Sequence, residues 1–149
     1  MEAIVSTIDI ARTPGDVFRF VSDPTRFPEW QRDVVTVRLE GPTPLGVGSR
    51  FMTVRRVGGV ERTLRQEITQ NSPPTSWAAR GIEGPIRANA AITIEALDGG
   101  SRSRVTFSLE FDGHGFGVPL LPLVRRQAQK GAPKSYQNLK DLLEGEATG

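Results

Sequence analysis

The chain has no cysteine and only one histidine among its 149 residues. Without cysteine it can form no disulfide bond, thiolate nucleophile or cysteine-ligated metal site. One histidine, with no paired carboxylates at ligand spacing, gives no reason to expect a tightly bound transition metal. No glycine-rich phosphate-binding motif follows a strand in the expected context. We therefore expect neither a metal nor a nucleotide cofactor.

Long apolar runs are also missing from the sequence. No segment reaches the ~18 consecutive apolar residues that suggest a membrane-spanning helix. The first residues, with Glu2 near the start and apolar positions alternating after it, lack the basic start and apolar block of a signal peptide. These absences predict a cytoplasmic protein without a transmembrane segment.

Lysine is scarce, occurring only at Lys130, Lys134 and Lys140, so most basic residues are arginines. They are interleaved with acids, and the net charge is +2. A nucleic-acid-binding protein more often concentrates its basic residues on one element or tail, so no nucleic-acid partner is expected. The length suits one domain with a substantial core. We expect that domain to span residues 1–144, with a frayed tail at 145–149.

Two short helices are predicted after a first strand at 3–10. Thr13 can cap the first helix and Pro14 suits its first turn. Asp23 and Pro24 repeat this signature before a second helix that runs to about Trp30. From residue 34 the apolar period changes to two, beginning with Val35, Val37 and Leu39. This alternation and the intervening turns predict six further strands, at about 35–39, 50–57, 60–69, 77–80, 86–96 and 104–111.

One long helix is predicted near the C-terminus, at roughly 120–143, with a kink at Pro133 and an end at Gly145. The strands before it are joined mainly by hairpin-length turns, which favours an antiparallel sheet. An apolar sheet face must be covered, and only this helix is long enough to cover it. The expected fold is therefore α+β, a curved seven-stranded antiparallel sheet wrapped around one long helix. A single helix cannot fill the concave face, so we also expect a pocket.

The element order and several local motifs resemble the START-like superfamily, also called the helix-grip or SRPBCC fold. The motifs look like those of its polyketide cyclase/dehydrase group, and they lie in residues 11–18, 22–24, 27–30, 46–51, 68–70 and 138–144. The resemblance implies a helix-grip fold that binds a small apolar molecule between the sheet and the C-terminal helix. Some members of the superfamily catalyse cyclisation or dehydration, and fold alone does not decide between these roles.

Aromatic residues are the first candidates for ligand contact. Trp30 and Trp77 could each form a flat wall for an aromatic ligand, or could be ordinary core anchors. The resemblance favours Trp30, because the second short helix usually closes one end of the cavity, and Phe27 lies beside it. In the last strand Phe107 and Phe111 must face inward, where those nearest the gap would touch a ligand.

Polar residues on the inner face are the second group of candidates. Alternation with Leu64 and Ile68 places Gln66 and Arg62 on the inner face of the fourth strand. Gln66 is central and could bond a ligand in the cavity, whereas Arg62 lies near the hairpin, where we expect solvent.

On the long helix, Leu120 and Val124 begin the stretch that would cross the pocket. Either of them could line the pocket or belong to an ordinary helix-on-sheet core. The isolated His114 could shuttle protons at the pocket mouth, or simply be an exposed loop residue.

Three functions stay open at this stage. The first is binding of a lipid-like, polyketide or aromatic molecule in an internal cavity. The second is a cofactor-free cyclase or dehydratase in the same cavity, with Gln66, Arg62 or His114 as hydrogen-bond donors. The third is an interaction or dimerisation module, and a homodimer is compatible with each function.

Overall fold

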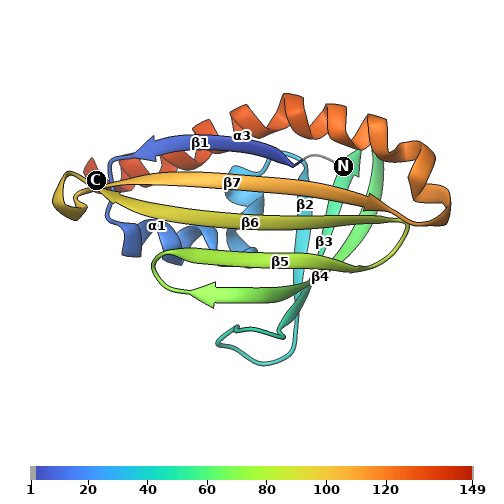
Figure 1. The fold of residues 1–149 in the computed structure, drawn as a ribbon, viewed down its shortest axis with the longest axis horizontal. Coiled ribbons are helices and arrows are strands. Elements are labelled where there is room, and N and C mark those ends of the chain that lie inside the picture. Colours follow the sequence, from blue (N-terminus) through green and yellow to red (C-terminus); the bar gives the residue numbers. More distant parts are fainter. Residues whose placement is uncertain (1–2, 149) are drawn as a thin grey trace.

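The computed structural model describes the chain from Ala3 to Thr148. Seven strands form one antiparallel sheet in the order β1-β7-β6-β5-β4-β3-β2. The strands are β1 (Ile4–Ile10), β2 (Val34–Glu40), β3 (Arg50–Val57), β4 (Val60–Ser72), β5 (Ser76–Glu83), β6 (Ile86–Leu97) and β7 (Arg102–Gly113). Figure 1 shows the sheet with α3 (Leu121–Thr148) lying across it. The α+β fold expected from the sequence is confirmed.

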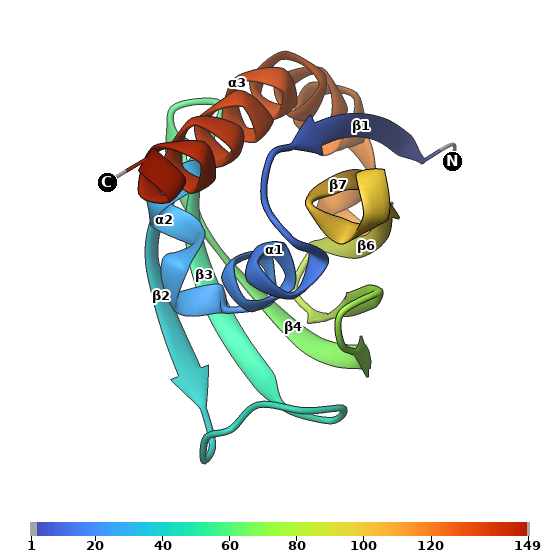
Figure 2. The same ribbon diagram turned by 90° about the vertical axis from the view of Figure 1, so that its left-hand side faces the viewer.

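Two short helices, α1 (Pro14–Val21) and α2 (Phe27–Trp30), lie between β1 and β2 as predicted, with the 3-10 turn η1 (Pro24–Arg26) between them. Thr13 caps α1 by accepting a hydrogen bond from the Asp16 backbone N–H at 3.3 Å. Asp23 accepts in the same way from Thr25 at 3.0 Å. In Figure 2 the sheet curves around these helices, and α3 lies across its open side between the edge strands β1 and β2.

The pairing of β2 with β3 contains a bulge, and the β3–β4 hairpin depends on glycine. The β2–β3 register shifts between Val34 and Thr36, so Val34 is buried and Val35 faces outward. The expectation that Val35 shares a face with Val37 and Leu39 is therefore wrong, because a bulge inserts one residue into the pairing. The β3–β4 hairpin turns at Gly58 and Gly59, whose positive φ values of 60° and 80° suit glycine.

The long helix also differs from its predicted bounds. It continues through Pro133 and past Gly145 to Thr148. Gly145 ends a helix only when it adopts a left-handed conformation, and it is not among the glycines with positive φ. Thus the end expected at Gly145 is wrong. Gly149, the last residue of the predicted tail, lies outside the described residues. Preceding α3, a 3-10 turn, η3 (Gly115–Leu120), links it to β7.

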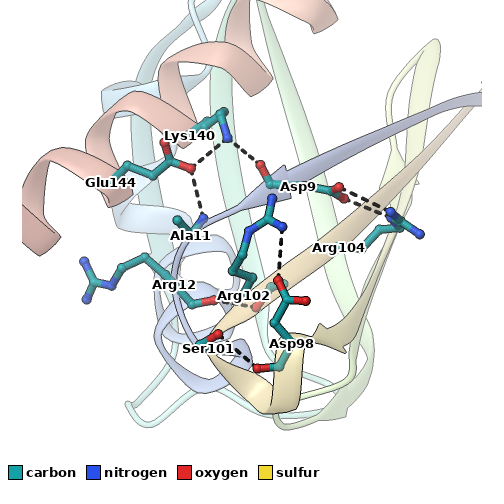
Figure 3. Close-up of polar contacts among 10 residues, drawn as sticks. Asp9, Ala11, Arg12, Asp98, Ser101, Arg102, Arg104, Lys140 and Glu144 are labelled. Carbon is teal, nitrogen blue, oxygen red and sulfur yellow. Dashed lines mark hydrogen bonds and ion pairs between the residues drawn. The ribbon is translucent and has the colours of Figure 1, made fainter.

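Polar contacts fix the C-terminal half of α3 to the end of β1 (Figure 3). Lys140 Nζ donates to the Asp9 carbonyl oxygen and to the Glu144 carboxylate, each at 2.7 Å. The Ala11 backbone N–H donates to Glu144 at 2.9 Å. Toward the other end of α3, Gln127 accepts a hydrogen bond from the Gly58 backbone N–H and donates one to the Arg56 carbonyl oxygen, each at 2.6 Å, which ties the helix to the β3–β4 hairpin.

The buried side chains form two separate clusters rather than one continuous core. The larger cluster joins α1, α2 and the C-terminal part of α3 to the sheet, and includes Phe18, Phe27, Trp30, Phe51, Trp77, Phe107 and Leu139. The smaller cluster lies where the start of α3 meets the sheet, and its buried members are Val57, Leu64, Ile86, Ala88, Phe111 and Val124. Because the two clusters do not merge, side chains do not fill all of the space between the sheet and α3.

Candidate functional site

A cavity of about 200 Å³ lies between the two clusters, enclosed by the concave sheet, α2 and α3. All six buried residues of the smaller cluster line it. From the larger cluster it takes Phe27, Trp30, Trp77, Ile92 and Phe107. Small residues of α3, among them Ala128, Gly131 and Ala132, keep the helix side of the cavity open. The pocket expected from the fold is therefore present.

Aromatic rings build one wall of the cavity. Phe27 meets Trp30 and Trp77 edge-on, with ring centroids 5.9 Å and 6.2 Å apart. Trp30 in turn lies 5.9 Å from Phe107, and Phe107 stacks on Tyr136 of α3. Edge-on and offset contacts of this kind hold rings in fixed orientations. The wall is consequently a preorganised apolar surface that joins α2, the sheet and α3.

Two polar groups on the cavity wall have hydrogen-bonding capacity to spare. Gln66 is 4% exposed, and its Nε2 donates to the Ala88 carbonyl oxygen at 2.8 Å. Only the amide nitrogen can donate to a carbonyl, so this bond fixes which end of the side chain is the oxygen. Within residues 3–148, neither that oxygen nor the Tyr136 hydroxyl has a hydrogen-bond partner. Both can serve a ligand.

Burial changes the chemistry of Tyr136, the only tyrosine in the chain. Loss of hydration around the phenolate raises the pKa of Tyr136 to about 12. The nearby Arg55 opposes this shift and Asp33 adds to it. At neutral pH the side chain is therefore an uncharged hydrogen-bond donor and acceptor rather than a base.

The indole of Trp30 is placed differently. Its Nε1 is fully buried and has no acceptor among the described residues. No space large enough for a water molecule adjoins this nitrogen. It is therefore packed among side chains and does not face the cavity. Trp30 thus presents ring surface to the cavity and no hydrogen-bond donor.

Charged residues gather at one end of the cavity, which we call the charged end (Arg32, Asp33, Arg55 and Arg62). Asp33 lies just after α2 and accepts from Arg55 Nη1 at 3.2 Å. Arg55 also donates from Nε to Thr53 Oγ1 at 3.3 Å. Arg62 lies opposite Arg55 in the β3–β4 register. The charged end therefore combines one satisfied ion pair with further positive charge.

Of the eight residues predicted to bind a ligand, seven line the cavity. They are Phe27, Trp30, Gln66, Trp77, Phe107, Phe111 and Val124. The eighth, Leu120, does not; it ends η3 and packs against the smaller cluster from outside the cavity. The helix begins one residue later than expected, at Leu121, so its inward-facing stripe starts at Val124. Whether the seven residues bind a ligand stays a prediction.

Two polar predictions have different outcomes. We expected Arg62 to lie in solvent, but it is half-buried and lines the cavity. The inward-facing side of β4 borders the cavity as far as this residue, although Arg62 lies near the hairpin. His114 is exposed just before η3 and is not part of the cavity wall. Its backbone N–H donates to the Pro85 carbonyl oxygen at 2.8 Å. His114 is thus a loop residue in this structure.

Sequence reasoning missed Tyr136, Asp33 and Arg55. Tyr136 lies next to the buried Ser135, and the width of a helix face allows both positions to point inward. Asp33 and Arg55 come from segments far apart in sequence, and only the strand register brings them together. The one available signal was that Tyr136 is a lone aromatic residue on a polar stretch of helix.

The described residues contain no group of three or more histidine, cysteine, aspartate or glutamate side chains that could hold a metal ion. Nor is any helix among them long and apolar enough to cross a membrane. These findings leave the cavity between sheet and helix as the candidate site.

The fold and cavity define a class of protein, in which a curved antiparallel sheet grips a C-terminal helix around an internal cavity. The family model described as "Polyketide cyclase / dehydrase and lipid transport" matches residues 1–144, and the chain belongs to this family. The family resemblance drawn from the sequence is confirmed.

Two Mycobacterium tuberculosis proteins are similar in sequence. The uncharacterized protein Rv2574 is 30% identical over 112 residues, a match that covers 72% of this chain and 65% of that protein. The uncharacterized protein Rv1546 is 25% identical over 143 residues, covering 95% of this chain and 99% of that protein. This chain therefore spans under two thirds of Rv2574 and nearly all of Rv1546.

Solved structures share the fold at low sequence identity. TTHA0849 from Thermus thermophilus has a TM-score of 0.78 at 17% identity, covering 97% of this chain and 98% of that one. A START superfamily protein from Mycobacterium smegmatis has a TM-score of 0.71 at 14% identity, with 98% and 97% covered. The di-domain ARO/CYC BexL has a TM-score of 0.72 at 13% identity, and the match covers 97% of this chain and 47% of BexL. At these identities the likeness concerns the fold.

Proposed function

We propose that this protein binds a small, mostly apolar molecule in the cavity between the sheet and α3. The observation that carries the proposal is the cavity itself, which separates two apolar clusters that could otherwise have packed into one core. An empty apolar cavity costs stability in proportion to its volume. A ligand of matching shape would remove that cost and bury its own apolar surface.

The cavity volume supports a compact ligand. An apolar cavity of roughly 150 Å³ admits benzene, whereas sites for drug-sized molecules span roughly 300–1,000 Å³. At about 200 Å³, the cavity suits a molecule of one or two rings better than a long acyl chain. Trp30, Phe107 and Trp77 present ring surfaces to the cavity, and a planar ligand can stack on one such ring in an offset geometry.

The cavity wall supports binding better than catalysis. A cyclase or dehydratase needs a group that removes a proton as well as donors that stabilise the enolate. The cavity offers donors, but Asp33, the only carboxylate on its described wall, is held by Arg55, and the pKa of Tyr136 is raised to about 12. His114 lies outside the cavity. A cyclase or dehydratase activity is therefore not proposed for this chain.

Binding can be tested with a neutral planar probe, 2-naphthamide. Both tryptophans of the chain line the cavity, so intrinsic fluorescence reports its occupancy directly. We expect saturable binding to the wild-type protein, checked by calorimetry, and a raised melting temperature in the presence of the probe. Native mass spectrometry of the freshly purified protein would show any molecule that is already bound.

A cavity-filling variant and its control make this test specific. Ala128→Phe places a ring in the cavity from α3 and should abolish probe binding. Ala96→Phe makes the same change at an exposed position of β6 and should leave binding intact. Equal binding by both folded variants would contradict the proposal, as would an empty wild-type protein that binds no apolar probe. The cytoplasmic location and the homodimer stay predictions.

A further inference from the structure

Arg62 is a half-buried cation in the cavity wall that makes no ion pair among the described residues. Its place on β4 puts it on the same face as the buried Leu64 and Gln66, and it is half-buried. No carboxylate within residues 3–148 lies within ion-pair distance of it. A guanidinium is never deprotonated in a protein, so Arg62 keeps its positive charge inside a partly desolvated site.

Its cross-strand neighbour increases this imbalance. Arg62 stands directly opposite Arg55 in the β3–β4 register, and like charges placed this way repel. Asp33 neutralises Arg55 by accepting its Nη1 with both carboxylate oxygens, at 3.2 Å and 3.3 Å. The single negative charge of Asp33 therefore balances Arg55, and Arg62 makes no ion pair with it. The guanidinium of Arg62 thus has no counter-charge in the part of the chain that the structure describes, and it lies at the charged end of the cavity.

The full set of charges on the wall points the same way. Three arginines and one aspartate line the cavity, and 3 − 1 gives a formal charge of +2. Arg32 is exposed to solvent, which hydrates its charge. Arg55 is paired. The excess that faces a bound ligand is therefore one positive charge, that of Arg62.

We infer that the ligand is an aromatic or other compact apolar acid, whose carboxylate is held by Arg62 while its apolar body lies against the ring wall. The inference rests on the proposed function and specifies its ligand class. A guanidinium offers two parallel N–H donors that match the two oxygens of a carboxylate. One guanidinium without an ion pair among the described residues matches a monoanion, and the cavity wall away from the charged end is mostly apolar, which suits the uncharged body of such a ligand.

The geometry also gives the ligand a direction. Arg62 is close to the β3–β4 hairpin, whereas Trp77 and Phe27 belong to the larger cluster at the other side of the cavity. A ligand with its carboxylate at Arg62 would extend its rings toward Trp30 and Trp77. Gln66 follows Leu64 by two residues on β4 and faces the same side of the sheet. Its amide oxygen can there accept a hydrogen bond from a donor on the ligand.

The inference is tested with two probes of equal shape, 2-naphthoate and the neutral 2-naphthamide, at a pH where the acid is ionised. We expect the wild-type protein to bind naphthoate at least about tenfold more tightly by calorimetry. Raising the salt concentration from about 0.05 M to about 0.5 M should weaken naphthoate binding and leave amide binding nearly unchanged.

Three variants locate the effect at Arg62. Arg62→Gln should remove the preference for naphthoate while keeping the affinity for the amide, which also proves that the variant is folded. Arg62→Lys should keep part of the preference, because it retains the charge and loses the two-pronged donor. Arg126→Gln removes a charge from an exposed position of α3 outside the cavity, and should change neither affinity.

The outcomes separate this inference from the proposed function. If Arg62→Gln abolishes the preference for naphthoate and Arg126→Gln leaves it intact, the carboxylate assignment and the proposed binding function are both supported. If the amide and the acid bind equally, or if Arg62→Gln and Arg126→Gln behave alike, the carboxylate assignment is overturned and the binding function stands. If neither probe binds the wild-type protein, both are overturned.

Discussion

The ring of Tyr136 lies flat on the ring of Phe107, with their centroids 3.9 Å apart and their planes inclined by only 8°. Phe107 belongs to β7 and Tyr136 to α3, so this pair is a direct contact between the sheet and the helix that covers it. The pair closes the cavity on the side of the larger cluster. It also buries much of the Tyr136 side chain, and the loss of hydration raises the pKa of its hydroxyl.

We predict that Tyr136 titrates with a midpoint near pH 12 instead of 10. Because Tyr136 is the only tyrosine, the ultraviolet absorbance of phenolate follows this group alone. The folded state keeps its proton after the unfolded chain has lost it. The contribution of Tyr136 to stability is therefore complete below pH ~10 and is lost as the pH rises toward ~12.

Titration of the denatured chain provides the control, and its midpoint should return to about 10. Circular dichroism must show that the native protein stays folded over the measured range. A midpoint near 10 in the folded protein would mean that the hydroxyl is as well hydrated as in the unfolded chain, and the burial of Tyr136 against Phe107 would be contradicted.

The hydrogen bond from Gln66 to Ala88 makes a second prediction. The paired part of β5 and β6 ends at Ala79 and Ala90, and the Gln66 side chain reaches the Ala88 carbonyl just beyond that point. Gln66→Leu removes the donor and leaves a buried carbonyl without it. We expect the free energy of unfolding to fall by about 1–3 kcal/mol, measured by urea denaturation.

The matched control for this change is Gln70→Leu, since Gln70 is exposed on the same strand. It should alter stability by no more than about 0.5 kcal/mol. Equal losses in the two variants would argue that strand propensity, rather than the buried bond, causes the effect.

Glu144 provides a pH-dependent prediction at the other end of α3 (Figure 3). The hydrogen bond from Lys140, followed by the one from the Ala11 backbone N–H, lowers the pKa of Glu144 below its usual 4.5. A lowered pKa stabilises the folded state above the unfolded value, and this stability is lost as the pH falls through the folded value. Glu144→Gln should therefore destabilise the protein at pH 7, by up to about 1 kcal/mol, and not in strong acid.

Urea denaturation of both proteins across the acid range measures this difference. Glu110→Gln, at an exposed position of β7 without an ion pair among the described residues, should match the wild type at every pH. A Glu144→Gln effect that persists unchanged at low pH would show that the carboxylate charge is not responsible.

The local sequence determined the elements of this fold because their signals lie within a few residues of one another. Thr13 and Asp23 cap helices through neighbouring backbone amides, and Gly58-Gly59 makes a tight turn possible. Period-two alternation placed Gln66 and Phe107 on the inner face, as the structure confirms. The aromatic wall was foreseeable for the same reason: large apolar residues on an inward face must lie next to the interior.

Only the tertiary structure decided the cavity's charged end. Asp33 meets Arg55 because β2 and β3 pair with a particular register, and Arg62 faces Arg55 because a hairpin aligns β3 with β4. The bulge at Val34–Thr36 and the inward turn of Tyr136 depend likewise on contacts across the fold. Local periodicity specifies which face a side chain occupies, but register and packing decide which distant groups share that face and how much water reaches them. The balance of charge in the cavity is therefore a property of the assembled fold.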